Sequence, residues 1–139
     1  MRRIAVSAAL AAALAVAVPA HSQSSADPAV QNVITSQIQA FRSGDDDRAF
    51  SFASPRIRAM FGSSGNFMDM VKNGYQPVYA PRNFTFGRAI ERDGTFYQEV
   101  LVTGPDGLEW VALYTLERIE DGSTRITGVR LARSNSPAI

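Results

Sequence analysis

The chain has 139 residues, with 14 basic and 13 acidic side chains, no cysteine and a single histidine. This length fits one compact domain, and the near-neutral charge gives no electrostatic support for binding nucleic acid or an anionic membrane. Without cysteine there is no disulfide, so the hydrophobic core alone must stabilise the fold.

The first 22 residues have the pattern of a cleavable secretory signal. Arg2 and Arg3 precede an apolar run over residues 4–18, and the small side chain of Ser22 precedes a cut before Gln23. The apolar run is shorter than the roughly 20 residues that span a bilayer, which argues against a stable membrane anchor. We therefore expect an exported protein, periplasmic or secreted.

Cleavage also limits the available chemistry. His21 would leave with the signal, so the mature chain would contain neither histidine nor cysteine. That excludes Ser-His-Asp and Cys-His catalysis and the usual zinc sites, and we expect neither a metal nor a cofactor. The expected division of the chain is residues 1–22 signal peptide, 23–26 polar leader, 27–133 a single α+β domain and 134–139 C-terminal tail.

The pattern after the leader predicts a first helix that begins at Asp27-Pro28, an N-cap acid followed by proline, and ends at Gly44. Its apolar positions recur at helical spacing: Val30, Ile34, Ile38 and Phe41. A second short helix is expected to begin in the acidic run 45–47, which suits a helix N-terminus better than a calcium loop because no further ligands follow at loop spacing.

Ser54-Pro55 repeats the cap-then-proline pattern and predicts a third short helical segment. Residues 62–65, a Gly-Ser-Ser-Gly sequence, are expected to form a loop. Phe67, Met70 and Val71 then make one more apolar helix face, and Asn73-Gly74 is expected to end that helix with a left-handed cap.

From residue 83 the hydrophobic period changes to two, which predicts four strands: 84–92, 95–103, 108–118 and 124–131. Asp93-Gly94 and Asp121-Gly122 are typical of two-residue hairpin turns, and residues 104–107 make a third turn. Helices followed by an uninterrupted antiparallel meander indicate an α+β fold.

These turns predict which side chains share a face of the sheet. The first face, expected to pack against the helices, carries Phe84, Phe86, Arg88, Ile90, Tyr97, Glu99, Leu101, Trp110, Ala112, Tyr114, Val129 and Leu131. The second is expected to carry Thr85, Ala89, Gln98, Val100, Val111, Leu113, Thr115 and Arg130. Because its centre is apolar, we expect a homodimer through Val100, Val111 and Leu113.

Four short motifs resemble the bacterial family called domain of unknown function 4864. They are residues 34–41 (ITSQIQAF), 53–55 (ASP), 78–79 (VY) and 110–114 (WVALY). The resemblance implies the NTF2-like or cystatin-like cone, in which N-terminal helices pack on a curved four-stranded antiparallel meander. It implies no activity, because the family is uncharacterised and fold alone does not determine function.

The predicted pairing places Arg88 opposite Glu99 on the aromatic face, with Tyr97, Trp110 and Tyr114 around them. A charge pair in apolar surroundings is costly to desolvate, which favours a functional reason for it, although a structural ion pair would look the same. These five residues are the candidate ligand-binding pocket. No catalytic residue is assigned, because Arg88 would lower the pKa of Glu99 and so weaken it as a general base.

Three functions are compatible with these patterns. The first is non-enzymatic binding of a small molecule or a protein partner in a cone-shaped pocket. The second is a cofactor-free enzyme, a hydrolase or isomerase, that uses a pocket carboxylate, arginine and tyrosine. The third is a structural homodimer with a filled core. The lack of histidine and the pairing of Glu99 with Arg88 favour binding over catalysis.

Overall fold

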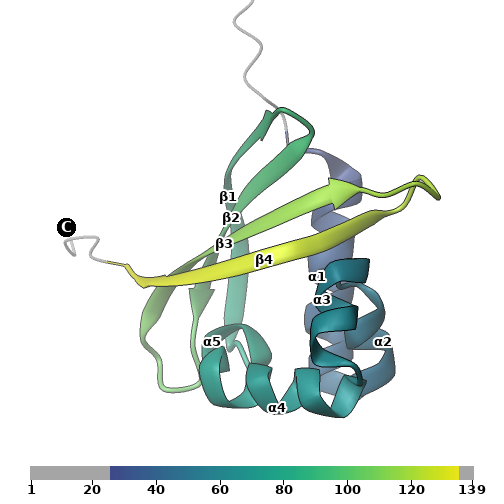
Figure 1. The fold of residues 1–139 in the computed structure, drawn as a ribbon. Helices are drawn as coiled ribbons and strands as arrows, with labels where there is room; N and C mark the ends of the chain where they lie inside the picture. The colour runs from purple at the N-terminus through teal and green to yellow at the C-terminus, as the bar shows by residue number, and fades with distance from the viewer. Residues whose placement is uncertain (1–25, 135–139) are drawn as a thin grey trace, which may run out of the picture.

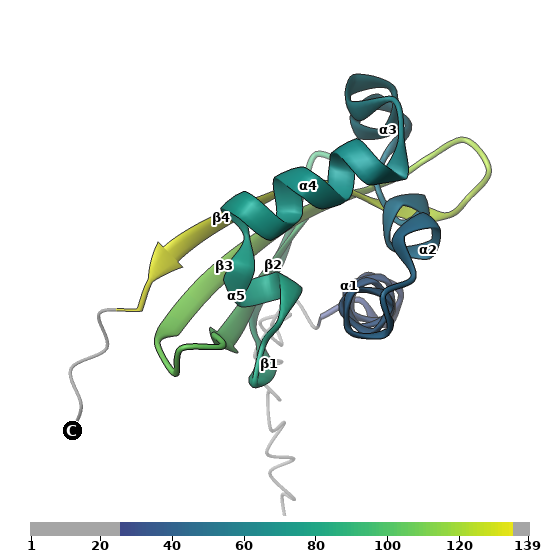
Figure 2. The same ribbon diagram turned by 90° about the horizontal axis from the view of Figure 1, so that it is seen from below.

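A computed structural model describes residues 26–134; the predicted signal and most of the C-terminal tail lie outside this range. The elements are α1 Pro28–Ser43, α2 Asp46–Ser51, α3 Pro55–Phe61, α4 Ser64–Gly74, α5 Gln76–Tyr79, β1 Asn83–Arg92, β2 Thr95–Thr103, β3 Glu109–Arg118 and β4 Thr124–Arg133. The strands form one antiparallel sheet in the order β1-β2-β3-β4. The helices lie against one face of this strongly twisted sheet (Figures 1 and 2). The predicted α+β fold is confirmed.

The ends of the first two helices follow from local chemistry. The carboxylate of Asp27 accepts a hydrogen bond from the Ala29 backbone N–H, and Gly44 ends α1 in the left-handed conformation at φ 68°. Asp45 caps α2 by accepting from the Arg48 N–H, so the acidic run is a helix start, as predicted. Within residues 26–134, no helix is both long and apolar enough to cross a bilayer.

Two predictions for the following segment are wrong. Residues 62–65 are not all loop: α4 begins at Ser64, because the hydroxyl of Ser63 accepts from the Asn66 N–H and caps it. The left-handed cap at Asn73-Gly74 does not form either. Gly74 stays in the helix, and a short unpredicted helix, α5, follows at once.

The β1–β2 hairpin begins as predicted. Asp93 and Gly94 both have positive φ, 51° and 81°, as a two-residue turn requires, and Ile90 pairs with Tyr97. A β-bulge at residues 87–88 then shifts the pairing by one, so that Phe86 faces Val100 and not Leu101.

The β2–β3 connection is longer than predicted, and this reverses the faces of β2. Thr103 pairs with Glu109, so the loop spans residues 104–108 and Leu108 is outside the strand. A bond from the Gly104 N–H to the Leu108 carbonyl, 2.8 Å, closes it. A shift of one residue moves every side chain to the other face. The predicted face assignment of β2 is therefore wrong. Phe96, Gln98, Val100 and Val102 are buried in the core, whereas Tyr97, Glu99 and Leu101 lie on the outer face.

The β3–β4 pairing agrees with the prediction because two deviations cancel. The turn at Asp121-Gly122 is not a two-residue turn, since Arg118 pairs with Thr124 across a longer loop. A second irregularity between Thr115 and Leu116 shifts the register back. The predicted pairs Tyr114–Val129 and Ala112–Leu131 are thereby confirmed.

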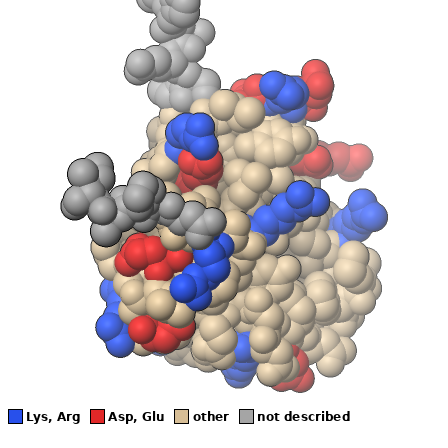
Figure 3. Space-filling model, turned by 90° about the vertical axis from the view of Figure 1, so that its left-hand side faces the viewer, with Lys and Arg blue, Asp and Glu red and all other residues tan. Residues whose placement is uncertain are grey.

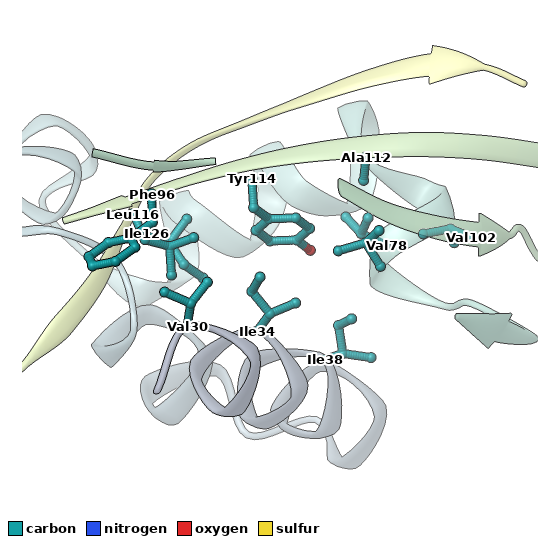
Figure 4. Packing of buried hydrophobic residues seen from close by; sticks show 11 residues of the cluster. Val30, Ile34, Ile38, Val78, Phe96, Val102, Ala112, Tyr114, Leu116 and Ile126 are labelled. Atoms are coloured by element: carbon teal, nitrogen blue, oxygen red, sulfur yellow. The ribbon is translucent and has the colours of Figure 1, made fainter. Parts of the chain in front are cut away.

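The main core lies between α1 and the inner face of the sheet. Ile34 and Ile38 are completely buried there, in one cluster with side chains of β2 and β3 that include Val102 and Tyr114 (Figure 4). Trp110 is on this face too, as predicted, but it is only partly buried and the Arg133 guanidinium lies 5.0 Å from its ring centroid. A second core cluster joins α1, α2 and α4 around Phe50, Phe67 and Met68.

The segment that leaves α2 is attached to β4. Ala53 forms a parallel bridge with Ile126, and the Ser54 N–H donates to the Ile126 carbonyl at 2.8 Å. The Arg125 guanidinium donates to the Ser51 carbonyl. These bonds fix the start of α3 beside β4 and so position one wall of the cleft described next.

Candidate binding cleft

The sheet separates the five residues of the predicted pocket into two groups. Arg88, Tyr97 and Glu99 lie on the outer face, and Trp110 and Tyr114 lie on the inner face. The five therefore do not line one pocket. The reason is that the 104–108 loop shifts the pairing of β2 with β3 by one residue, so that the side chains of β2 lie on the faces opposite to those predicted.

The contact between Arg88 and Glu99 does form, but at the surface. The Arg88 Nη2 donates to Glu99 Oε1 at 2.9 Å, and its Nε and backbone N–H donate to Oε2 at 3.1 and 3.3 Å. The side chain of Arg88 is 88% exposed and that of Glu99 is 24% exposed. This pair holds the bulge of β1; it is not the floor of a pocket.

The hydrogen bonds from the Arg88 side chain lower the pKa of Glu99, and burial opposes them only in part. Glu99 therefore stays ionised near neutral pH, as the sequence suggested. Gly87, beside it, has a steric reason to lack a side chain: a Cβ there would lie 3.2 Å from the Glu99 Cβ.

A cleft of about 350 Å³ lies on the other side of the sheet, between the helices and the inner faces of β3 and β4. Helices α3 and α4 supply Ile57, Met60, Phe61, Phe67, Met70 and Val71. The sheet supplies Tyr114, Ile126 and Val129, and Val78 of α5 contributes as well. Met60 is 66% exposed, so this cleft reaches the surface at α3.

Few polar groups reach the cleft. The Gln37 Nε2 donates to the Ala49 carbonyl at 3.1 Å, and the Thr127 hydroxyl donates to that of Thr115 at 2.9 Å. The Tyr114 hydroxyl is buried and, within the described part of the chain, has no hydrogen-bond partner. Burial raises the pKa of Tyr114 well above its ordinary value. No Asp, Glu, Lys or Arg of residues 26–134 lines this cleft.

The cleft has no chemistry for holding a metal ion. Across residues 26–134, no group of three or more His, Cys, Asp or Glu side chains is arranged so that it could hold a metal ion. The arrangement can exclude water from an apolar molecule, and the Tyr114 hydroxyl can donate a hydrogen bond. It cannot supply an acid–base pair from its own lining.

The sequence predicted Tyr114 as a site residue, but it did not predict that helix residues line a cavity with it. Phe67, Met70 and Val71 were predicted as an apolar helix face, without a cavity beneath it. The available signal was the presence of three large apolar side chains, Ile57, Met60 and Phe61, within the seven residues of α3.

Comparison with known proteins identifies a family but no activity. Residues 23–139 match the model of the family described as Domain of unknown function (DUF4864), which confirms the predicted resemblance. The comparison with curated proteins found no match.

Two solved structures are similar in fold. A DUF4783 family protein from Bacteroides ovatus ATCC 8483 has a TM-score of 0.48 at 11% identity, over 73% of this chain and 94% of its own. An NTF-2 like protein of unknown function from Burkholderia xenovorans LB400 has a TM-score of 0.48 at 13% identity, over 79% and 88%.

Proposed function

Because the chain belongs to the DUF4864 family, whose description names no activity, we propose its function from the cleft: the protein binds a small apolar molecule without transforming it. The observation that carries this proposal is a cleft of about 350 Å³ whose lining is almost entirely apolar. Ligand pockets commonly have volumes of about 300–1,000 Å³, apolar walls and a few polar groups.

The side chains at the opening suit a binding role. Met60 and Met70 are flexible and polarisable, so they can adapt to ligands of different shape. Met60 is exposed beside an apolar cleft, where it lowers solubility and does not stabilise the core. A ligand that covers Met60 would remove this apolar side chain from water.

The two alternative functions have less support. The enzyme alternative needs a carboxylate and an arginine in the pocket, but Glu99 and Arg88 lie on the opposite face of the sheet. The alternative of a filled core does not account for a cleft of about 350 Å³ open at α3. A binding function is compatible both with an open cleft and with the absence of Glu99 and Arg88 from its lining.

The test is saturable binding of a neutral apolar dye, N-phenyl-1-naphthylamine, followed by its fluorescence. Ile57→Trp should narrow the cleft and weaken binding at least about tenfold, which corresponds to about 1.4 kcal/mol. The matched control is Ile90→Trp on the outer face, where Ile90 is 49% exposed. It should leave the affinity unchanged. Equal losses in both variants, or no saturable binding, would refute the proposal.

We also propose that the protein is exported and acts in the periplasm or outside the cell. The support is the signal pattern of residues 1–22, together with a family match that starts at residue 23. Protein isolated from its native host should have an intact mass that begins at or near Gln23. A mass that begins at Met1 would exclude this proposal.

A further inference from the structure

Tyr114 is the most deeply buried polar side chain that lines the cleft. It projects from β3 between the sheet and α1, with its oxygen on the side where Val78, another lining residue, lies (Figure 4). The side chain is 0% exposed, and its hydroxyl finds no acceptor among residues 26–134. A buried donor without an acceptor is costly, so native structures rarely retain one without a reason.

The hydroxyl can act only as a neutral group under ordinary conditions. Burial raises its pKa further above neutral pH, so that it stays protonated and can donate a hydrogen bond. A phenylalanine would fill the same space and would avoid the unpaired donor. The presence of this hydroxyl therefore indicates that the bound molecule carries a hydrogen-bond acceptor.

The surroundings of Tyr114 restrict the charge of that acceptor. The described lining contains no lysine or arginine, so a carboxylate or phosphate would enter without a counter-ion. An unpaired buried charge costs much more than a buried neutral carbonyl that accepts one hydrogen bond. A carbonyl has the further advantage that it brings no donor of its own to be satisfied.

We infer that the cleft selects neutral, largely apolar molecules that carry a carbonyl oxygen, and that the Tyr114 hydroxyl donates a hydrogen bond to this oxygen. The inference rests on the proposed function and adds the chemical class of the ligand. A volume of about 350 Å³ equals about twelve water molecules at their liquid volume of about 30 Å³ each, which limits the ligand to a small molecule.

The experiment compares three probes of similar shape by equilibrium dialysis: naphthalene, 2-acetylnaphthalene and 2-naphthoate. Each is measured with the wild-type protein, with Tyr114→Phe, and with Tyr97→Phe, which makes the same chemical change on the outer face. The ratio of the affinities for 2-acetylnaphthalene and naphthalene should fall about tenfold in Tyr114→Phe, the value of one hydrogen bond to a buried donor. Tyr97→Phe should leave this ratio unchanged, and 2-naphthoate should bind wild type at least about tenfold more weakly than the ketone.

A second measurement does not depend on the variants. The carbonyl stretch of 2-acetylnaphthalene bound to the wild-type protein should lie at lower frequency than in an apolar solvent, because it accepts a hydrogen bond. An unshifted stretch, or an affinity ratio that is the same in Tyr114→Phe and wild type, overturns the inference and leaves the binding function intact. Binding of 2-naphthoate as tight as that of the ketone also overturns it. If the wild-type protein binds none of the three probes, the proposed function itself fails.

Discussion

The carboxylate of Glu99 holds both the backbone and the side chain of the extra residue in the β1 bulge. It accepts from the Arg88 N–H and from two guanidinium nitrogens of the same residue. Because the Arg88 side chain is 88% exposed, water competes with the ion pair and screens it, so its net contribution to stability is small. The bond to the backbone N–H is the one that restrains the bulge.

The stability that Glu99 provides should depend on pH. Its hydrogen bonds to the Arg88 side chain lower its pKa below the ordinary value of 4.5, so the folded-state pKa is below the unfolded one. Such a group stabilises the fold above the unfolded pKa, and this contribution is lost as the pH falls through the folded pKa. Glu99→Gln should therefore lower the urea midpoint slightly near neutral pH and by less below about pH 3. An equal loss at both pH values would show that the charge of Glu99 is not involved.

The Arg88–Glu99 contact was predictable because it depends on a local rule. The Asp93-Gly94 turn sets the start of the hairpin, and a few pairs further along the two side chains meet even with the bulge present. The face of the sheet on which this contact lies was not predictable from the same local rule. Whether Glu99 faces the core depends on the 104–108 loop, which is one residue longer than the predicted turn of residues 104–107.

At the scale of the elements, side chains and loops together determine the strand register. Gln98 is 1% exposed, and its Nε2 donates to the carbonyls of Gly87, Arg88 and Glu99 at 3.3, 3.4 and 2.9 Å. It thus donates, from the core side, to backbone oxygens of the bulge and of the residue opposite it.

Gln98→Leu should destabilise the protein by about 1–2 kcal/mol, because it removes the hydrogen bonds from Nε2 to these carbonyls. It also removes the unpaired Oε1 of Gln98, which offsets part of this loss. Urea unfolding measures the loss, and amide exchange at Arg88 should become faster as the bulge loosens. The control is Thr103→Val, at the end of the same strand, which should cost less than about 0.5 kcal/mol. A loss no greater than that of the control would mean that the bulge forms without Gln98.

There is a physical reason why the helix starts were predictable from the sequence and the strand register was not. Helix starts at Asp27, Asp45 and Ser54 were predictable because each cap is satisfied within one turn of the chain. The strand register depends on the loop lengths and on the bulges, which involve contacts between strands and leave only weak signals in the sequence. Gly87, a glycine in the middle of a strand, was one such signal. The cleft was not predictable, because a cavity is space that packing leaves unfilled, and periodicity describes only the faces around it.

At the scale of the whole molecule, the outer face of the sheet exposes several apolar side chains beside charged ones. Ile90 is 49% and Leu101 is 44% exposed there, and Val111 and Leu113 are partly exposed beside them. Among the described elements, the helices are on the opposite face (Figures 1 and 2). The predicted interface residue Val100 does not belong to this surface: it is completely buried in the core, so its inclusion was wrong.

The side of the molecule in Figure 3 shows charged groups of both signs, scattered over largely uncharged surface. Neither sign of charge dominates this side of the molecule. An open antiparallel sheet normally has a polar solvent face, so exposed leucine and isoleucine here favour an interface between two copies of the chain.

We therefore expect a homodimer through Leu101, Val111 and Leu113, with Ile90 at its margin. Sedimentation equilibrium at micromolar concentration should give about twice the monomer mass, since apolar residues at the centre of an interface and polar ones at its rim are typical of homodimers. Leu113→Asp places an unpaired charge at this centre and should reduce the mass to that of a monomer. Met60→Asp introduces the same charge on α3, at a residue that is 66% exposed on the helix side, and should leave the dimer intact. A wild-type protein that sediments as a monomer at every concentration would contradict the proposal, as would equal effects of the two substitutions.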